Sequence, residues 1–314
     1  MRALTTVSAG LALSLAAALP AAAFSFDAHV IGAEHSFRML PAQLQKTYEA
    51  EAQALLALID DEEMLQYLNR YDASAFARIS ILPDLLRRTE LPDTFALFGQ
   101  TMPDSIAALP EKAGSMGHYI NIGYVPGESA NDSSIRVPNV TTVLPAFKAA
   151  LPEVEGVQRA IVNAYITHLV FDATQPMHAI AWINEDYPAG DLGGNATCFQ
   201  PDPIQGGCAR NLHSLFDSLA GWTVSYRLGM SMDDAIAEIA ASETPADQSR
   251  SYLPIAQLSQ ESSQYAEGIY GPVLNGPIES KAEREAYQQQ WQPIMKGRLN
   301  LAAHRLADLH VQRL

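Results

Sequence analysis

The sequence is poor in positive charge, in cysteine and in long apolar runs. Its 314 residues include 20 lysines and arginines against 35 aspartates and glutamates, a formal net charge of −15. Without a basic cluster, general electrostatic attraction to duplex nucleic acid is not expected, and attraction for an anionic substrate must be local, for example from bound metal cations. After residue 23 no stretch is long and apolar enough for a membrane span, so stable membrane association is not expected.

The one long apolar run lies at the start of the sequence. A basic residue at position 2 precedes the apolar residues 11–19, and Pro20 is followed by three alanines. A basic start, an apolar segment and small residues at the end describe a secretory signal peptide. We predict that residues 1–23 are removed by cleavage after Ala23, which leaves residues 24–314 as one secreted or periplasmic domain; the alternative is an uncleaved anchor.

Only two cysteines are present, Cys198 and Cys208, ten residues apart in a glycine-rich segment. In an oxidising compartment we expect them to form a disulfide that closes this segment. The alternatives are zinc ligands, for which further partners at suitable spacing are lacking, and free thiols.

Apolar residues at helical spacing dominate the remainder, and strand-like alternation is rare and short, so we predict a mainly α fold. Two segments rich in Gly, Pro, Ser and Asn, 101–145 and 184–209, are predicted to be loops. Pro83 should interrupt one helix, and Pro176 should end another because its ring clashes with the carbonyl four residues earlier. The predicted helices span residues 42–60, 73–88, 153–175, 210–227, 231–242, 255–270 and 279–311.

The most informative pattern is a repeated pairing of histidine with aspartate. His168 and Asp172 are four residues apart in the predicted helix 153–175, and His213 and Asp217 repeat the spacing. Residues four apart lie on the same face of a helix, and imidazole and carboxylate groups are zinc ligands by type. Each pair is therefore predicted to supply two ligands to a metal ion.

The first pair is predicted to face the protein interior. Val157, Ile161 and Tyr165 extend the same helical stripe toward the N-terminus and make that face apolar. The helix end at Pro176 re-aims His178, which adds a third imidazole. Two pairs and a further histidine predict a multinuclear metal site and hence an enzyme.

Six segments of the sequence, in order, match the motifs of one known family. They are FSFDAH (24–29), LPDLLR (82–87), HYIN (118–121), ITHLVFDATQPMHAI (166–180), GDLGGN (190–195) and NLHSLFDS (211–218). With them the chain resembles the three-zinc single-strand-specific nucleases (the mung bean nuclease-like family) of the zinc-dependent phospholipase C/nuclease superfamily, and the resemblance runs from Phe24 into the last helix. The phospholipases have Glu where this chain has Asp217, and they usually lack the GDLGGN motif. The resemblance implies a single-domain, mainly α fold with few short strands.

The resemblance further implies three zinc ions per chain. The first would be held by Asp84, His118, His168 and Asp172, and the second by His178, His213 and Asp217. The third would be held by the α-amine and carbonyl of Phe24, by His29 and by a shared Asp172. A terminal amine with a pKa of about 7.7–8.0 can lose its proton to a metal, whereas the amide of an uncleaved precursor cannot.

The same resemblance assigns Asp84, Arg87 and Asp172 to catalysis. The matching arginine of the family contacts the scissile phosphate, for which a planar guanidinium is well shaped. Without the motif, a solvated surface arginine is the simpler interpretation of Arg87. LPD stands where the family has W-A-D, and Phe24 stands where it has Trp; the second change should matter little because the backbone ligates.

Three further residues are implied to bind substrate. Tyr119 matches an aromatic residue that stacks on an unpaired base, with a core tyrosine as the alternative. Asn121 replaces the aspartate that reads a base edge in the family. Asn195 either orients the substrate or caps its own loop.

The implied function is that of an exported zinc-dependent nuclease domain. It would hydrolyse single-stranded RNA and DNA to 5′-nucleotides, with 3′-nucleotidase activity, by attack of a metal-activated hydroxide on phosphorus. The expected partners are single-stranded nucleic acid and nucleotides, and we expect a monomer. The alternatives are a zinc-dependent phospholipase C on the same fold and a zinc-sequestering protein, although storage favours closed coordination shells.

Overall fold

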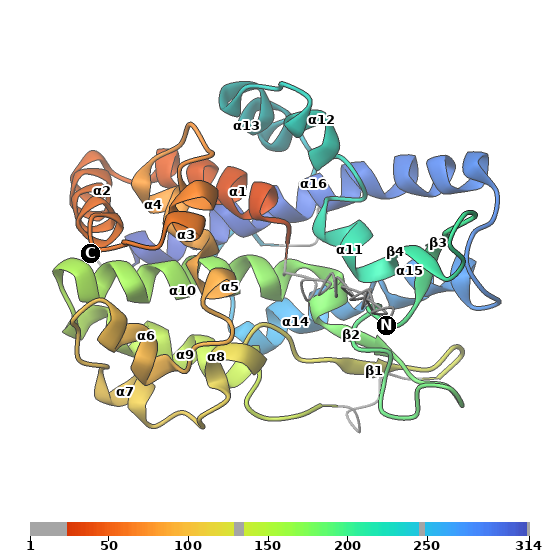
Figure 1. The fold of residues 1–314 in the computed structure, drawn as a ribbon, viewed down its shortest axis with the longest axis horizontal. Coiled ribbons are helices and arrows are strands. Elements are labelled where there is room, and N and C mark those ends of the chain that lie inside the picture. Colours follow the sequence, from red (N-terminus) through yellow and green to blue (C-terminus); the bar gives the residue numbers. More distant parts are fainter. Residues whose placement is uncertain (1–23, 129–134, 245–248, 313–314) are drawn as a thin grey trace, which may run out of the picture.

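The centre of the fold is α10 (Gly156–Thr174), which carries the first His–Asp pair (Figure 1). Every residue from 160 to 174 is buried, so the predicted burial of that pair is confirmed. The prediction that only one face of this helix is buried is wrong, because neighbouring helices cover all faces of α10 over this stretch. The helix ends at Thr174, as predicted from Pro176, and continues into the 3-10 helix η4 (Pro176–His178).

The computed structural model describes residues 24–128, 135–244 and 249–312, so the predicted signal peptide, residues 1–23, lies outside the described residues. Within them the fold is mainly helical with short strands, as predicted. None of the described helices combines the length and the apolar character that a membrane span needs. Before α10 the helices are α1 (Phe26–Met39), α2 (Ala42–Leu56), α3 (Glu62–Leu68), α4 (Ala75–Arg78), η1 (Ile79–Ile81), α5 (Leu82–Leu85), α6 (Leu91–Leu97), α7 (Asp104–Ala107), α8 (Ala113–Met116), α9 (Val140–Ala150) and η3 (Leu151–Glu153). After η4 they are α11 (Leu212–Asp217), α12 (Thr223–Arg227), α13 (Met232–Ala240), α14 (Ile255–Ser263), α15 (Ala266–Tyr270), η5 (Gly271–Val273) and α16 (Lys281–Val311).

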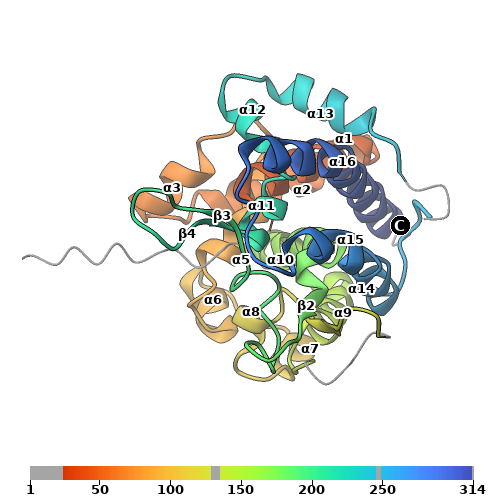
Figure 2. The same ribbon diagram turned by 90° about the vertical axis from the view of Figure 1, so that its right-hand side faces the viewer.

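Two helices from opposite ends of the described chain, α1 and α16, run side by side along α10 (Figures 1 and 2). The close approach of the three helices depends on Gly32 in α1. A Cβ at this position would lie 2.7 Å from Cε1 of Phe171 and 2.8 Å from Cδ1 of Leu299, closer than carbon atoms can pack. The approach brings His29 of α1 against α10.

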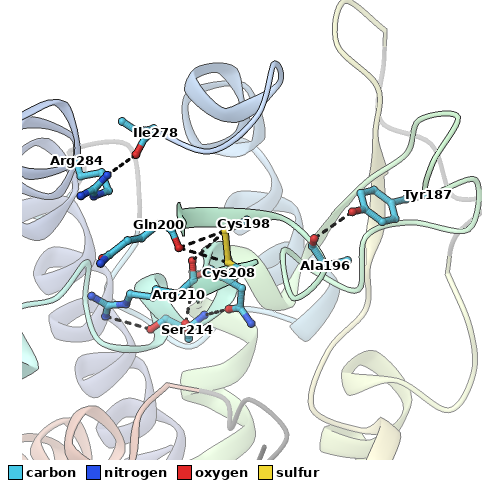
Figure 3. Close-up of a disulfide and its surroundings, with 10 residues drawn as sticks. Tyr187, Ala196, Cys198, Gln200, Cys208, Arg210, Ser214, Ile278 and Arg284 are labelled. Atoms are coloured by element: carbon cyan, nitrogen blue, oxygen red, sulfur yellow. Dashed lines mark hydrogen bonds between the residues drawn. A yellow bond between two sulfur atoms is a disulfide. The ribbon is translucent and has the colours of Figure 1, made fainter. Parts of the chain in front are cut away.

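Two small sheets tie the motif segments together. Strand β1 (Ile122–Tyr124) pairs in parallel with β2 (Ile180–Trp182), so the segments that follow His118 and His178 are hydrogen-bonded to each other. Strand β3 (Cys198–Pro201) is antiparallel to β4 (Cys208–Asn211). The predicted Cys198–Cys208 disulfide closes this hairpin (Figure 3).

Several predicted boundaries are wrong. Helices α1, α3 and α6 have no counterpart among the predicted helices. The segment 101–145 contains α7, α8 and the start of α9, and α9 is stabilised by a capping box in which Asn139 and Thr142 bond each other's backbone. The predicted helix 210–227 is broken between α11 and α12, where Leu219 and Ala220 adopt positive φ values of 53° and 54°.

Candidate metal centre

The fold brings all eight predicted side-chain ligands into one buried region. His29 comes from α1, Asp84 from α5, the pair on α10 from the centre, and the others from the turn after α8, from η4 and from α11. They form three groups, in each of which one ligand atom per residue lies within 4.8 Å of the others. We name them the Asp84 group (Asp84, His118, His168), the His29 group (His29, His168, Asp172) and the His178 group (His178, His213, Asp217).

Asp172, a member of the His29 group, also faces the Asp84 group. Its Oδ1 is 3.4 Å from Nε2 of His29, and its Oδ2 is 3.0 Å from Nδ1 of His118 and 3.2 Å from Nε2 of His168. Oδ1 also lies 3.9 Å from Nδ1 of His178. One carboxylate therefore faces the His29 group with one oxygen and the Asp84 group with the other, which is the geometry of a bridging ligand.

Backbone carbonyls orient four of the imidazoles. A carbonyl only accepts hydrogen bonds, so the ring nitrogen beside it must carry the proton, and the other nitrogen keeps its lone pair for the cluster. This leaves Nδ1 of His118 and Nε2 of the other three rings facing inward. The bonds are His168 Nδ1 to the Ser80 carbonyl at 2.8 Å, His178 Nδ1 to His118 at 2.7 Å, His213 Nδ1 to Gly193 at 2.6 Å, and His118 Nε2 to Gly114 at 3.1 Å.

Several buried polar atoms of the groups have no hydrogen-bond partner among the described residues. They are both ring nitrogens of His29, both carboxylate oxygens of Asp84, Oδ1 of Asp172 and Nε2 of His178. Unpaired buried polar atoms are unfavourable unless an ion or water satisfies them. Imidazole nitrogens and carboxylate oxygens are both ligands of zinc in proteins, so the residues present fit this metal.

Burial and charge set the protonation of the cluster. Burial lowers the pKa of His29 and of His178 to about 4 and the pKa of His213 to about 3. These three imidazoles are neutral at neutral pH and can donate a lone pair. Burial also opposes a charge on His168, but the carboxylates of Asp172 and Asp84 outweigh it and raise the pKa of His168 to about 9. Without metal this ring therefore keeps a proton on Nε2 at neutral pH, and it must release that proton to bind a metal.

The two carboxylates of the His–Asp pairs have pKa values that are shifted in opposite directions. Burial disfavours ionisation of Asp172, but His168 and His178 outweigh it and hold the pKa of Asp172 well below its usual range. Burial raises the pKa of Asp217 well above its usual range, because its hydrogen bond from Gln175 does not compensate for lost solvent. A cation in the His178 group would supply the missing positive charge.

Gln175 and Asp191 shape the site, although no role was predicted for either. Nε2 of Gln175 donates to Oδ1 of Asp217 at 2.7 Å, and Oε1 accepts from the N–H of Met177. Asp191 is fully buried and anchors the GDLGGN loop. It accepts from the N–H of Trp182 at 2.9 Å, the hydroxyl of Tyr270 at 3.0 Å and the hydroxyl of Thr197 at 2.6 Å. Their position in the sequence could have indicated these roles, because Gln175 lies in the motif 166–180 between predicted ligands and Asp191 lies in the GDLGGN motif.

The paired glycines of the same loop are required by space and by backbone conformation. Gly193 has a φ of +64°, and a Cβ there would lie 2.4 Å from the carbonyl oxygen of Met177. Gly194 has a φ of +82°, and a Cβ would lie 2.4 Å from Cε of Met177. Because the Gly193 carbonyl accepts from His213, the loop sets the orientation of a predicted ligand.

The predicted substrate-contacting residues border the cluster. Nη1 of Arg87 is 4.0 Å from Oδ1 of Asp84, and its side chain is only 20% exposed, so it is not a freely solvated arginine. Tyr119 is half-buried. Asn121 adopts a φ of 57° and lies beside Gly193. The side-chain amide of Asn195 donates to the carbonyl of Leu192 at 2.9 Å, which agrees with the loop-capping interpretation.

Phe24 is fully buried and lies beside the His29 group. Its ring meets that of His29 edge-on, with centroids 6.0 Å apart. The next residue, Ser25, donates its N–H to the carbonyl of Asp217 at 2.8 Å. The backbone at position 24 is therefore held between two of the three groups.

Two cavities lie elsewhere. One of about 860 Å³ is lined by residues that include Glu238, Tyr265 and Lys296, and one of about 380 Å³ by residues that include Glu34 and Asp233. No predicted ligand lines either cavity, so the chemistry of the donor set, rather than cavity size, identifies the site.

Comparison with known families agrees with the motifs. The S1/P1 nuclease family model matches residues 45–313, a span that contains every predicted ligand except Phe24 and His29. A comparison with curated proteins finds no match to the chain.

Proposed function

Because the chain belongs to the S1/P1 nuclease family, and is therefore a nuclease that acts on nucleic acid, we propose a more specific activity. The protein is an exported zinc-dependent phosphodiesterase that hydrolyses single-stranded RNA and DNA to 5′-nucleotides and has 3′-nucleotidase activity. The observation that carries the proposal is the position of Asp172, whose two oxygens face two different imidazole groups.

We assign the ligands of the three zinc ions according to the Asp84, His178 and His29 groups. Asp84, His118, His168 and Asp172 hold one zinc ion, and the His178 group holds a second. Phe24, through its amine and carbonyl, holds a third with His29 and the shared Asp172. The unpaired buried atoms of His29, Asp84 and Asp172 support this assignment.

Zinc ions bound there would lower the pKa of a water molecule and offset the negative charge of the phosphate. Asp172, ionised and fixed by three imidazoles, sets the spacing of two of the sites. Asp84 orients one site and lies beside Arg87. The guanidinium of Arg87 binds two oxygens of the scissile phosphate with its planar fork.

Substrate selection falls to residues at the border of the cluster. Tyr119 stacks on an unpaired base, which favours single strands because a duplex base is not available for stacking. Asn121 contacts a base edge. Asn195 acts mainly through its loop, since its amide is already bonded to Leu192.

Removal of residues 1–23 completes the site in this proposal. Cleavage after Ala23 converts the amide nitrogen of Phe24 into an amine that can bind metal. The disulfide between Cys198 and Cys208 supports export, because such bonds persist in oxidising compartments. A mature protein that retains Ala23 should lose one zinc ion and most of its activity; full activity of this extended form would refute the role of Phe24.

The test is elemental analysis of the mature protein together with activity on defined substrates. We expect three zinc ions per chain, fewer in His168→Ala, and turnover of single-stranded RNA and DNA that a chelator abolishes. Phosphatidylcholine is the comparison substrate, because phospholipases C share the fold. Chelator-resistant hydrolysis, or preferential cleavage of phosphatidylcholine, would overturn the proposal.

A further inference from the structure

The proline that follows α10 deprives the last helix carbonyls of their usual partners. In a continuous helix the carbonyls of Ala173 and Thr174 would accept from the N–H groups of Met177 and His178. Here the N–H of Met177 donates to the side chain of Gln175, and the N–H of His178 donates to the carbonyl of Gln175 at 3.1 Å. Both helix residues are buried, so their carbonyls need other donors.

Side chains from α14 and α16 supply these donors. Oγ of Ser262 lies 2.8 Å from the carbonyl oxygen of Ala173, and its proton is shared with the carbonyl of Leu258 at 2.9 Å. Nε of Arg298 donates to the carbonyl of Thr174 at 3.0 Å, and Nη2 donates to Oγ of Ser262 at 2.6 Å. Both helices border α10 (Figure 2).

Arg298 is a fully buried cation at the C-terminal end of α10. Positive charge is favourable there, because the unpaired carbonyls carry the negative end of the helix dipole. Arg298 also contacts Glu261, whose Oε2 lies 3.7 Å from Nη1, and the ring of Tyr265, whose centroid lies 5.5 Å away. None of these groups is a proposed metal ligand, and the bond to Thr174 connects Arg298 to the site through α10.

The segment after this capped end supplies the His178 group. Gln175 follows Thr174 directly and holds Asp217, and His178 ends the same turn. We propose that Arg298 is a positioning residue for the His178 group: by binding the end of α10 it fixes the turn from which Gln175 and His178 reach the metal. The inference rests on the proposed zinc site, and it concerns one group of the three.

The chain offers a matched control for the test. Arg305, also on α16, is fully buried and binds the same Glu261, at 2.8 Å and 3.0 Å, but its Nε donates to the carbonyl of Ser249 instead of to α10. Arg298→Met and Arg305→Met therefore remove the same kind of buried cation. Only the first also removes a cap from the metal-binding helix.

The experiment measures zinc affinity and thermal stability of the full mature chain, with zinc alone as the probe and a competing chromophoric chelator. We expect Arg298→Met to weaken one zinc site by about 10–100-fold, the usual effect of losing a group that orients a ligand. Arg305→Met should lower stability but leave all zinc affinities within about twofold of the parent protein. Equal zinc affinities in the two variants would overturn the inference.

Milder variants keep the test decisive if Arg298→Met does not fold. Ser262→Ala removes the bond near Ala173, and Arg298→Lys keeps the charge without the fork. Both should weaken the same single site by a smaller factor, and unchanged affinity in both would count against the inference. Failure of the proposed function would appear differently, as absence of zinc from the parent protein.

Discussion

The imidazole rings of His29 and His168 lie face to face, with their centroids 4.0 Å apart and their planes 8° apart. The stack joins α1 to α10 at the candidate metal centre. Burial lowers the pKa of His29, and the charge on His168 lowers it further. Two stacked histidines of the same type therefore titrate on opposite sides of neutrality, one at about 4 and the other at about 9.

This difference predicts how stability of the metal-free protein depends on pH. In the unfolded chain all histidines have a pKa of about 6.5. Between pH 6.5 and about 4 the unfolded state binds protons that folded His29, His178 and His213 refuse, so stability falls as the pH falls. Asp217, whose pKa is raised by burial, has the opposite effect on stability, but it is one group against three histidines. Above pH 6.5 the folded state alone holds the proton of His168, so stability falls as the pH rises toward about 9.

Urea unfolding in excess chelator at a series of pH values checks this prediction. The midpoint should be highest near pH 6.5 and lower on both sides. In His168→Gln the decline on the alkaline side should be reduced. A midpoint of the parent protein that rises steadily from pH 6.5 to 9 is incompatible with the raised pKa of His168.

Gln175→Leu should weaken zinc binding in the His178 group without unfolding the protein. Leucine fills a similar volume but cannot donate to Asp217, whose orientation depends on that bond. The expected loss is about 10–100-fold in the affinity of one zinc site, measured by chelator competition. Gln158→Leu is the control, because Gln158 lies near the other end of α10 and bonds the distant carbonyl of Thr101. An unchanged set of affinities in Gln175→Leu would contradict the orienting role.

Gly193→Ala should lower both stability and zinc affinity. The new Cβ would meet the carbonyl oxygen of Met177 at 2.4 Å, and the displaced loop would release His213. Gly206→Ala separates the effect of the steric clash from the effect of the left-handed backbone. Gly206 also has a positive φ, +74°, but no atom lies within 4 Å of its added Cβ. Gly206→Ala should cost about 1–2 kcal/mol of stability from the left-handed backbone alone. Urea unfolding and zinc analysis should show a larger loss in Gly193→Ala, together with weaker metal binding; parallel behaviour of the two variants would rule out the clash.

Arg87→Lys should reduce catalysis and spare the metal. Lysine keeps the positive charge but cannot bind two phosphate oxygens with a planar fork. A loss of about 10–100-fold in kcat/KM on single-stranded DNA is expected, corresponding to the ~1.5–3 kcal/mol of a hydrogen bond to a charged group. Arg88→Lys, at the exposed neighbouring position, should retain parent activity. If zinc content falls in Arg87→Lys, the residue supports Asp84 instead of the substrate.

Part of the metal centre could be predicted from local sequence. The spacing of His168 and Asp172 places both on one helix face, because the helical repeat alone fixes side-chain direction. Pro176 ends that helix for an equally local reason, since its ring and missing N–H stop the hydrogen-bond pattern. Imidazole and carboxylate groups then predicted metal binding, because both are zinc ligands by type. The structure adds that the predicted side-chain ligands lie together.

Two other features were missed, one because its cause lies far away in the chain and one because a local signal was outweighed. Helix α1 is buried by α10 and α16, so its sequence has no exposed polar face to mark it as an amphipathic helix. The loop predicted over 101–145 ends early because the local cap at Asn139 starts α9, a signal that was present but outweighed by the loop-like composition before it.

The sequence by itself determined that His168 and Asp172, and likewise His213 and Asp217, share one helix face, because spacing along one helix is a local property. Tertiary structure alone decided that the carbonyls of Ser80 and Gly193 meet His168 and His213, and that Arg298 reaches the end of α10. Such contacts depend on which helices pack together, and packing is set by shape and burial over the whole chain rather than by any short pattern within it.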